Sequence, residues 1–303
     1  MSNKLLVISG PTATGKTALA VKLAKKYNGE LISADSRQIY IGLDIGVGKD
    51  HPVGTPIHLI DIITPDKTFS VAQFQSLALD IINEIHSRGH LPIVVGCSGL
   101  YVNSLISTFS TFHIRPFPLL RFILNRLPLR VLQFLLKLLQ PSVFASLNHS
   151  DINNPYRLIR KIEISLSRQA YEPNHSPFDI LHLSLTAPSS YLFPRIDQRV
   201  EDRLKLGHLK ELNSLRSHYP WSAPALSVSA YKCLRSYLEN KSTLSQSITA
   251  WKIAEHQDAK HQKTYFQKIK PALFIDISHP DYVKNACLLV KKWYNLSNET
   301  NQS

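Results

Sequence analysis

The sequence Gly-Pro-Thr-Ala-Thr-Gly-Lys-Thr at residues 10–17 follows an apolar run, residues 5–8, and precedes a helical pattern, residues 18–24. Glycines at the two ends of such a loop let successive backbone N–H groups converge on phosphate oxygens, at the positive end of the helix dipole. Lys16 would add a positive charge, and Thr17 a hydroxyl that can bind Mg2+. An ordinary glycine turn is the alternative, but the strand and helix flanks favour a phosphate-binding loop. Its expected binding residues are Gly10, Pro11, Thr12, Ala13, Thr14, Gly15, Lys16 and Thr17.

Strand-like runs recur along the chain, and several alternate with helical patterns, which is typical of a parallel α/β fold. The expected strands cover residues 4–8, 30–34, 91–95, 181–185 and 273–277. We expect one helix over residues 71–88 and a second from Pro194 to about Ser217, with Pro194 in its first turn. Together with the phosphate loop, this pattern predicts a P-loop NTPase-like parallel sheet flanked by helices. The polar residues 295–303 are expected to be frayed.

The alternation stops between residues 107 and 177, where Pro128 and Pro141 separate two or more expected helices. We interpret this segment as a small helical domain that is inserted into a catalytic core of residues 1–106 and 178–303. Residues 130–139 within it are strongly apolar. They could lie on a membrane surface, but packing against neighbouring helices explains the pattern equally well, and we favour packing.

The formal net charge is +13, which favours a polyanionic partner. The charge is unevenly placed, because no acidic residue lies between Glu84 and Asp151. The basic residues in that interval are Arg88, Arg115, Arg121, Arg126, Arg130 and Lys137. We expect this segment to face phosphates, and a solvated basic face is the alternative.

The composition predicts a soluble, globular protein, with 44% hydrophobic residues and no apolar run long and uncharged enough to span a bilayer. The apolar run within residues 1–8 is too short for a secretory signal. The three cysteines, at positions 97, 233 and 287, are odd in number and widely spaced, which argues against a disulfide framework or a zinc site. We therefore expect a cytoplasmic protein that does not associate with membranes.

Asp35 follows the second expected strand, and the carboxyl ends of strands in an open parallel sheet surround the ligand crevice. A carboxylate placed there, beside bound phosphates, can orient a nucleophile and accept its proton. The alternative role is an N-cap for a following helix. A diphosphate cradle with a neighbouring base suits transfer from a diphosphate-bearing donor, and at this level a kinase and a transferase with a diphosphate leaving group are not distinguished.

The order of the motifs resembles that of the tRNA dimethylallyltransferases (tRNA isopentenyltransferases, the IPP transferase family). The phosphate loop is followed by Ala-Asp-Ser-Arg-Gln-Ile-Tyr at residues 34–40 and by Asp-Ile-Gly at residues 44–46. Further similar motifs lie at residues 58–61, 69–74, 99–101, 157–163 and 192–200. The resemblance covers residues 4 to about 105 and 153 to 277, and it is the order and spacing of the motifs that make it specific.

The resemblance implies transfer of a dimethylallyl group from dimethylallyl diphosphate to N6 of the adenosine immediately 3′ of a tRNA anticodon, with release of diphosphate. The phosphate loop would hold the departing diphosphate, with Mg2+ on Thr17 and with Arg195 and Arg199 neutralising charge. Asp35 would take the proton of the adenine amine. The target base would have to leave the anticodon stack. The implied catalytic residues are Asp35, Arg195 and Ser98.

The resemblance also implies a set of tRNA contacts. Ser36, Arg37 and Gln38 would line the pocket of the flipped base. Arg157 and Arg160, three apart on an expected helix, would grip the RNA backbone, with surface salt bridges as the alternative. The implied tRNA-binding residues are Asp35, Ser36, Arg37, Gln38, Ser98, Arg157, Arg160, Lys161 and Lys260. The partners are then tRNA and dimethylallyl diphosphate, and we expect a monomer.

Three places depart from the family pattern. Residues 96–99 read Gly-Cys-Ser-Gly where Gly-Gly-Thr-Gly is usual, so Cys97 brings a Cβ to a point where the backbone can need to pass close to a ligand. His256 and His261 replace arginines, which predicts lower tRNA affinity because a neutral imidazole cannot offer arginine's fork. Residues 228–231 read Val-Ser-Ala-Tyr where Ala-Leu-Gly-Tyr is usual, and the missing glycine would shift a turn.

Because the phosphate loop, Asp35 and Arg195 are intact, we expect a divergent but active enzyme. Two enzymatic alternatives remain, a small-molecule kinase that uses ATP and an isopentenyltransferase that acts on free adenine nucleotides. Neither explains the basic insertion. A third alternative is a catalytically weak or silent tRNA-binding paralogue.

Overall fold

The computed structural model describes residues 3–108, 117–167 and 174–299. It divides into two compact units, residues 1–107 with 176–303, and residues 108–175. Each unit is described by itself.

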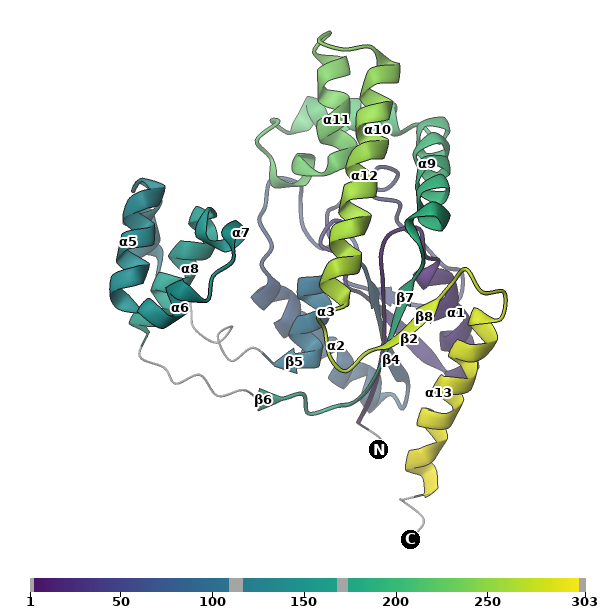
Figure 1. Cartoon of the computed structure of the whole chain (residues 1–303). Helices are drawn as coiled ribbons and strands as arrows, with labels where there is room; N and C mark the ends of the chain where they lie inside the picture. Colours follow the sequence, from purple (N-terminus) through teal and green to yellow (C-terminus); the bar gives the residue numbers. More distant parts are fainter. Residues whose placement is uncertain (1–2, 109–116, 168–173, 300–303) are drawn as a thin grey trace. The chain divides into compact units, whose positions relative to one another are not determined.

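The larger unit is built on a six-stranded parallel sheet with the order β3-β2-β4-β1-β7-β8 (Figure 1). The strands are β1 (Lys4–Ser9), β2 (Gly29–Ser33), β3 (Ile57–His58), β4 (Leu91–Gly96), β7 (Asp179–Thr186) and β8 (Leu273–Asp276). All six residues of β1 are buried, as expected for a central strand that is covered on both faces. The five strands expected from the sequence are confirmed, and β3 is an additional short edge strand.

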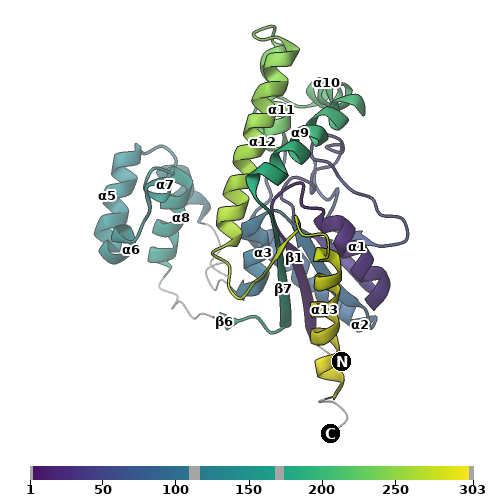
Figure 2. The same ribbon diagram turned by 45° about the vertical axis from the view of Figure 1, so that its right-hand side comes forward.

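Helices α1 (Lys16–Tyr27) and α13 (Tyr282–Glu299) cover one face of this sheet, and α2 (Val71–Ser87) and α3 (Gly99–Ile106) cover the other. The remaining helices of this unit are α9 (Ser189–Lys205), α10 (His208–His218), α11 (Ser229–Leu238) and α12 (Leu244–Phe266), with a 3-10 turn at Pro224–Ser227. The buried hydrophobic residues of α10 and α11 belong to a separate core cluster that includes no strand residue. Leu6 and Ile8 of β1 pack in one core cluster with residues of α1 and α13, which lie on the same side of the sheet (Figure 2). Leu5 and Val7 pack in a second cluster with α2 and α3. The period-two alternation of β1 therefore divides its side chains between the two cores.

The helix predicted from Pro194 to Ser217 is wrong in both its start and its continuity. α9 begins at Ser189, after an N-cap at Pro188, so Pro194 lies inside the helix and not in its first turn. α9 then ends at Lys205, and α10 starts after Gly207, whose φ of 103° no α-helix accommodates. The expected frayed tail is also corrected in part, because α13 continues to Glu299, while residues 300–303 lie outside the described part of the chain.

The smaller unit is helical. Its helices are α4 (Pro118–Leu124), α5 (Leu129–Leu139), α6 (Pro141–Ala145), α7 (His149–Ile152) and α8 (Pro155–Leu166). Pro128 caps α5 and Pro141 opens α6, so both prolines separate helices as predicted. The strands β5 (Ser107–Thr108) and β6 (Asn174–His175) form a separate two-stranded sheet.

The core of the smaller unit explains only part of the apolar stretch at residues 130–139. Leu132 and Leu136 are buried among side chains of α4 and α8. Phe134 and Leu138 on the same helix are 64% and 68% exposed. Packing therefore accounts for one face of α5. In the described parts of the chain, no helix is both long enough and apolar enough to cross a membrane.

Candidate active site

The predicted phosphate-binding loop connects β1 to α1, and two glycines shape it. Gly10 has φ 142°, and a Cβ there would clash with the carbonyl oxygen of Leu185 on β7. Gly15 has φ 77° and is the N-cap of α1. Both conformations are costly for residues with a Cβ, so the glycines are required by the shape of the loop. The backbone N–H groups at the start of α1 consequently face the same region as the helix dipole.

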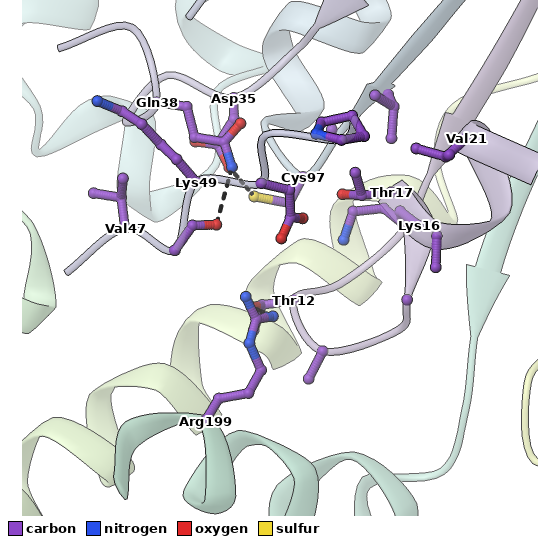
Figure 3. A pocket seen from close by; sticks show the side chains of 18 of the residues that line it. Thr12, Lys16, Thr17, Val21, Asp35, Gln38, Val47, Lys49, Cys97 and Arg199 are labelled. Atoms are coloured by element: carbon purple, nitrogen blue, oxygen red, sulfur yellow. Dashed lines mark hydrogen bonds between the residues drawn. The ribbon is translucent and has the colours of Figure 1, made fainter. Parts of the chain in front are cut away.

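A cavity of about 1120 Å³ lies over this loop, at the carboxyl ends of β1, β2 and β4 (Figure 3). It is lined from the loop and α1, from the segment after β2, from residues 47–52, from the end of β4, and from α9. The predicted site residues among its lining are Thr12, Ala13, Gly15, Lys16, Thr17, Asp35, Gln38, Arg195 and Arg199. The position at the carboxyl ends of parallel strands is where open α/β sheets bind their ligands.

Other predicted residues do not line the cavity. Gly10, Pro11 and Thr14 are buried, and the Thr14 hydroxyl donates to the Pro11 carbonyl at 2.8 Å. Ser36, Arg37 and Ser98 lie beside the cavity lining without belonging to it. Lys260 is exposed on α12, with its ammonium 5.3 Å from the ring centre of Phe193.

Lys16 provides a positive charge beside the loop. Its ammonium donates to the Pro11 carbonyl at 2.6 Å. Burial lowers the pKa of Lys16, and the neighbouring Arg199 lowers it further, whereas Asp35 opposes the shift. Two cations placed close together over an anion-binding loop destabilise each other until an anion is bound.

The arginines of α9 contact the opposite side of the loop. Arg195 Nε donates to the Ala13 carbonyl at 3.0 Å, and Arg199 Nη1 donates to Thr12 Oγ1 at 3.3 Å. Figure 3 shows Arg199 extending from its helix toward Thr12. The structure therefore brings both predicted arginines to the phosphate loop.

Asp35 lies just beyond β2 and lines the cavity. Its Oδ1 accepts a hydrogen bond from the Arg37 backbone N–H at 2.9 Å, and its Oδ2 accepts one from Cys97 Sγ at 3.0 Å. Residues 36–39 form a turn and not a helix, so the alternative N-cap role is wrong, and the bond to Arg37 is a local turn of the kind aspartate favours.

The ends of β2 and β4 approach each other very closely at this point. A Cβ on Gly96 would clash with the Ala34 carbonyl, and the Ser98 backbone N–H donates to that same carbonyl at 3.1 Å. Ser98 Oγ accepts from the Ser36 backbone N–H at 2.8 Å. Cys97 is accommodated between these contacts, with its side chain toward Asp35. Ser98 thus acts on the backbone that carries Asp35 and not on the cavity itself.

Residues 44–49 begin with the Asp-Ile-Gly motif, and Val47, Gly48 and Lys49 after the motif form a wall of the cavity. Glu211 on α10 accepts hydrogen bonds from the backbone N–H groups of Asp44, Ile45 and Gly46 at 2.6 to 2.8 Å. Burial opposes ionisation of Glu211, but hydrogen bonds from His208, Tyr231 and this backbone lower its pKa to about 2. The carboxylate is therefore charged at neutral pH and fixes the loop.

The other residues that depart from the expected pattern lie at the start of α11 and on α12. Ala230 lies in the first turn of α11, so the missing glycine does not shift a turn there. His256 Nε2 lies 2.8 Å from Asp197, and its ring stacks on Phe193 at 4.0 Å. His261 is exposed on the same helix, and its effect on tRNA affinity stays a prediction.

The basic residues predicted in the insertion have acidic neighbours. Arg157 pairs with Asp151 at 2.6 Å, and Arg160 pairs with Glu163 at 3.3 Å. These pairs match the salt-bridge alternative, which does not exclude RNA contacts by the same groups. Lys161 is half-buried on α8.

Several cavity residues were not predicted from the sequence. They include Val47, Gly48, Lys49, Asp50, His51 and Pro52. Gln262 on α12 lies outside the cavity lining, but its Oε1 accepts a hydrogen bond from the Thr12 backbone N–H at 2.9 Å. The available signal for residues 47–52 was the Asp-Ile-Gly motif at residues 44–46, which directly precedes them.

Two family models match the chain. One, described as IPP transferase, matches residues 38–269, and the other, described as isopentenyl transferase, matches residues 3–55. Curated relatives include tRNA dimethylallyltransferases of Roseiflexus sp. (36% identical, covering 95% of this chain and 98% of the relative) and of Halalkalibacterium halodurans (36% identical, covering 94% of each).

Solved structures are similar over the same length. A tRNA isopentenylpyrophosphate transferase from Bacillus halodurans superposes with a TM-score of 0.76 at 33% identity and covers all of both chains. A eukaryotic dimethylallyltransferase described as acting on tRNA superposes with a TM-score of 0.83 at 26% identity, covering 98% of this chain and 80% of that one.

Proposed function

The chain belongs to the IPP transferase family and is a tRNA prenyltransferase, and from this premise we propose its donor, its target atom and the roles of its residues. The donor is dimethylallyl diphosphate, and the target is N6 of the adenosine immediately 3′ of the anticodon. The observation that carries the proposal is that the phosphate loop, Asp35 and both arginines of α9 meet in one cavity of about 1120 Å³. A diphosphate anchor and a base for the attacking amine are then available within one site.

The phosphate loop binds the diphosphate of the donor. Its N–H groups, the ammonium of Lys16 and the guanidinium groups of Arg195 and Arg199 surround the place where charge develops as the C–O bond breaks. Donors held in position before the reaction stabilise such charge at little reorganisation cost. The bond between Arg195 and the Ala13 carbonyl shows that this arginine reaches the loop without further movement of α9.

Asp35 accepts the proton of the adenine amine. The amine is conjugated into the purine ring and is a poor nucleophile, so removal of its proton as the new N–C bond forms lowers the barrier. Asp35 and residues of the phosphate loop line the same cavity, which supports an attack on a carbon held next to the diphosphate. Gln38, which also lines the cavity, is placed to contact the base.

Mg2+ fits the donor set of this site. Thr17 offers a hydroxyl oxygen in the cavity lining, and Mg2+ in phosphate sites takes few protein ligands together with phosphate oxygens and water. Within the described residues, no group of three or more His, Cys, Asp or Glu side chains could hold a metal, so the phosphates must supply most of its ligands. When bound, the ion supplies charge neutralisation at the leaving diphosphate.

The RNA contacts belong to the same proposal. The target nitrogen is hidden inside a base stack, so the nucleotide has to be extruded to reach Asp35. Arg157, Arg160, Lys161 and the other basic residues of the helical insertion would bind phosphates, which makes affinity fall with salt. We further propose a monomer in the cytoplasm, consistent with three cysteines that form no disulfide.

One experiment tests the proposal. The purified protein is incubated with unmodified tRNA, Mg2+ and dimethylallyl diphosphate, and the digested nucleosides are weighed by mass spectrometry. We expect one adenosine to gain a dimethylallyl group in step with diphosphate release. Unmodified RNA with salt-sensitive binding would instead indicate a silent tRNA-binding protein. Parallel reactions with ATP, and with free AMP in place of tRNA, test the kinase and the nucleotide-prenylating alternatives.

A further inference from the structure

We propose that Cys97 is a positioning residue, whose thiol holds the Asp35 carboxylate in the orientation that proton transfer needs. The inference rests on the proposed function, because the orientation of Asp35 matters for catalysis only if this group takes the substrate proton. Its geometric basis is the hydrogen bond from Cys97 Sγ to Asp35 Oδ2 at 3.0 Å, inside the cavity lining (Figure 3).

The backbone around Cys97 fixes the direction of its side chain. Gly96 and Ala34 are in direct contact, and the N–H of Ser98 donates to the Ala34 carbonyl at 3.1 Å. The Ser98 hydroxyl in turn accepts from the Ser36 N–H at 2.8 Å. These contacts join the end of β4 to the end of β2 on both sides of Cys97 and Asp35. Cys97 and Asp35 are therefore held facing each other.

The thiol remains protonated and can donate. Burial raises the pKa of Cys97 far above its usual range, and the negative charge of Asp35 raises it further, while Lys16 opposes the shift only in part. A thiol is ordinarily a weak donor, but a hydrogen bond to an ionised carboxylate is stronger than one to a neutral acceptor.

The hydrogen bond from Arg37 alone does not fix the orientation of the Asp35 carboxylate. Rotation of the carboxylate about its terminal bond is weakly restricted, and the bond from the Arg37 N–H fixes only Oδ1. The thiol of Cys97 is the contact that fixes Oδ2. Each carboxylate oxygen can accept more than one hydrogen bond, so Oδ2 keeps room for the amine proton of the substrate.

Kinetics of three variants test this role. We expect Cys97→Ala to lower kcat for prenyl transfer about tenfold, with KM for the donor and Kd for tRNA changed less than about twofold. Cys97→Ser retains a donor and should recover most of kcat. Cys233→Ala, at a half-buried cysteine outside the cavity lining, is the matched control and should keep wild-type kcat.

A double-mutant cycle separates positioning from general disturbance. If Cys97 acts through Asp35, Cys97→Ala in an Asp35→Ala background should change the residual kcat less than about twofold. Equal loss in both backgrounds, or failure of Cys97→Ser to recover activity, would overturn the proposal.

Infrared spectra of the S–H stretch give a measurement that needs no turnover. The band lost in Cys97→Ala should lie below those of Cys233 and Cys287, and it should move to higher frequency in Asp35→Ala. A Cys97 band that does not respond to Asp35→Ala refutes the inference even when wild-type transfer is normal. An enzyme without transfer but with this response refutes the proposed function and leaves the contact itself established.

Discussion

Glu30 and Asp35 are two carboxylates at opposite ends of the same strand, and their surroundings differ completely. Glu30 is 6% exposed within β2 and is bonded to Arg88 at 3.0 Å, to His58 at 2.7 Å and to His90 at 2.8 Å. Asp35, just beyond β2, accepts its two hydrogen bonds from uncharged donors, a backbone N–H and a thiol. The first carboxylate has its lone pairs used inside the protein, and the second keeps some for a ligand.

This difference teaches how one strand can serve stability and chemistry. Burial opposes ionisation of Glu30, but its bonds to Arg88, His58 and His90 prevail and lower its pKa to about 2. These hydrogen bonds use both oxygens of Glu30 and fix the start of β2 to its neighbours. They leave no lone pair of this carboxylate available to a ligand. At the other end, incomplete saturation costs stability but makes Asp35 available to a substrate proton. Mutation of Asp35 should therefore lower kcat and spare stability, whereas mutation of Glu30 should lower stability and spare kcat.

The largest effect is expected for Asp35→Ala. Loss of a general base should lower kcat by roughly a hundredfold to ten-thousandfold. Binding of tRNA and the free energy of unfolding should stay close to the wild-type values, because only uncharged donors lose their acceptor. Single-turnover transfer, filter binding and urea unfolding measure the three quantities. Wild-type kcat in this variant would remove Asp35 from the mechanism.

The converse variant is Glu30→Gln, which keeps the side-chain shape and removes the charge. A shift of the Glu30 pKa from 4.5 to about 2 corresponds to about 3 kcal/mol of stability at neutral pH. We expect the free energy of unfolding to fall by that order, while kcat below the melting temperature changes less than about threefold. If Glu30→Gln lost activity as Asp35→Ala does and kept its stability, the contrast between the two carboxylates would be false.

The pH dependence of stability sharpens the same contrast. Because the pKa of folded Glu30 is below its unfolded value, its contribution is fully present above about pH 5 and is lost as the pH falls toward 2. Roughly half of it should remain near pH 3. Urea unfolding of wild type and Glu30→Gln between pH 7 and 3 measures this, and the difference between the two free energies of unfolding should shrink to about half by pH 3. A difference that stays constant would mean that the charge of Glu30 is not its source.

The sequence predicted the reactive end of β2 far better than the saturated end. The phosphate loop and Asp35 are recognisable because local residue types, in a short run, determine both their backbone shape and their chemistry. The contacts of Glu30 with Arg88 and His90 and the Cys97–Asp35 contact join residues 58 to 62 positions apart, which meet only when β2 and β4 pair. Pro194 misled the helix prediction because proline is favoured at a first turn, yet the capping position of Pro188 determined the start of α9.

The smallest effect is expected for His90→Ala, which removes one of the three partners of Glu30. His90 Nδ1 lies 2.8 Å from Glu30 Oε1, which also accepts from Arg88 Nε at 3.0 Å. The carboxylate stays bonded to Arg88 and His58, so the loss should be that of a single partly exposed hydrogen bond, about 1 kcal/mol in the free energy of unfolding. Prenyl transfer should be unchanged. A loss as large as that in Glu30→Gln would show that the cluster acts as one cooperative network and not as separate contacts, and a double-mutant cycle with Arg88→Ala would then measure the coupling.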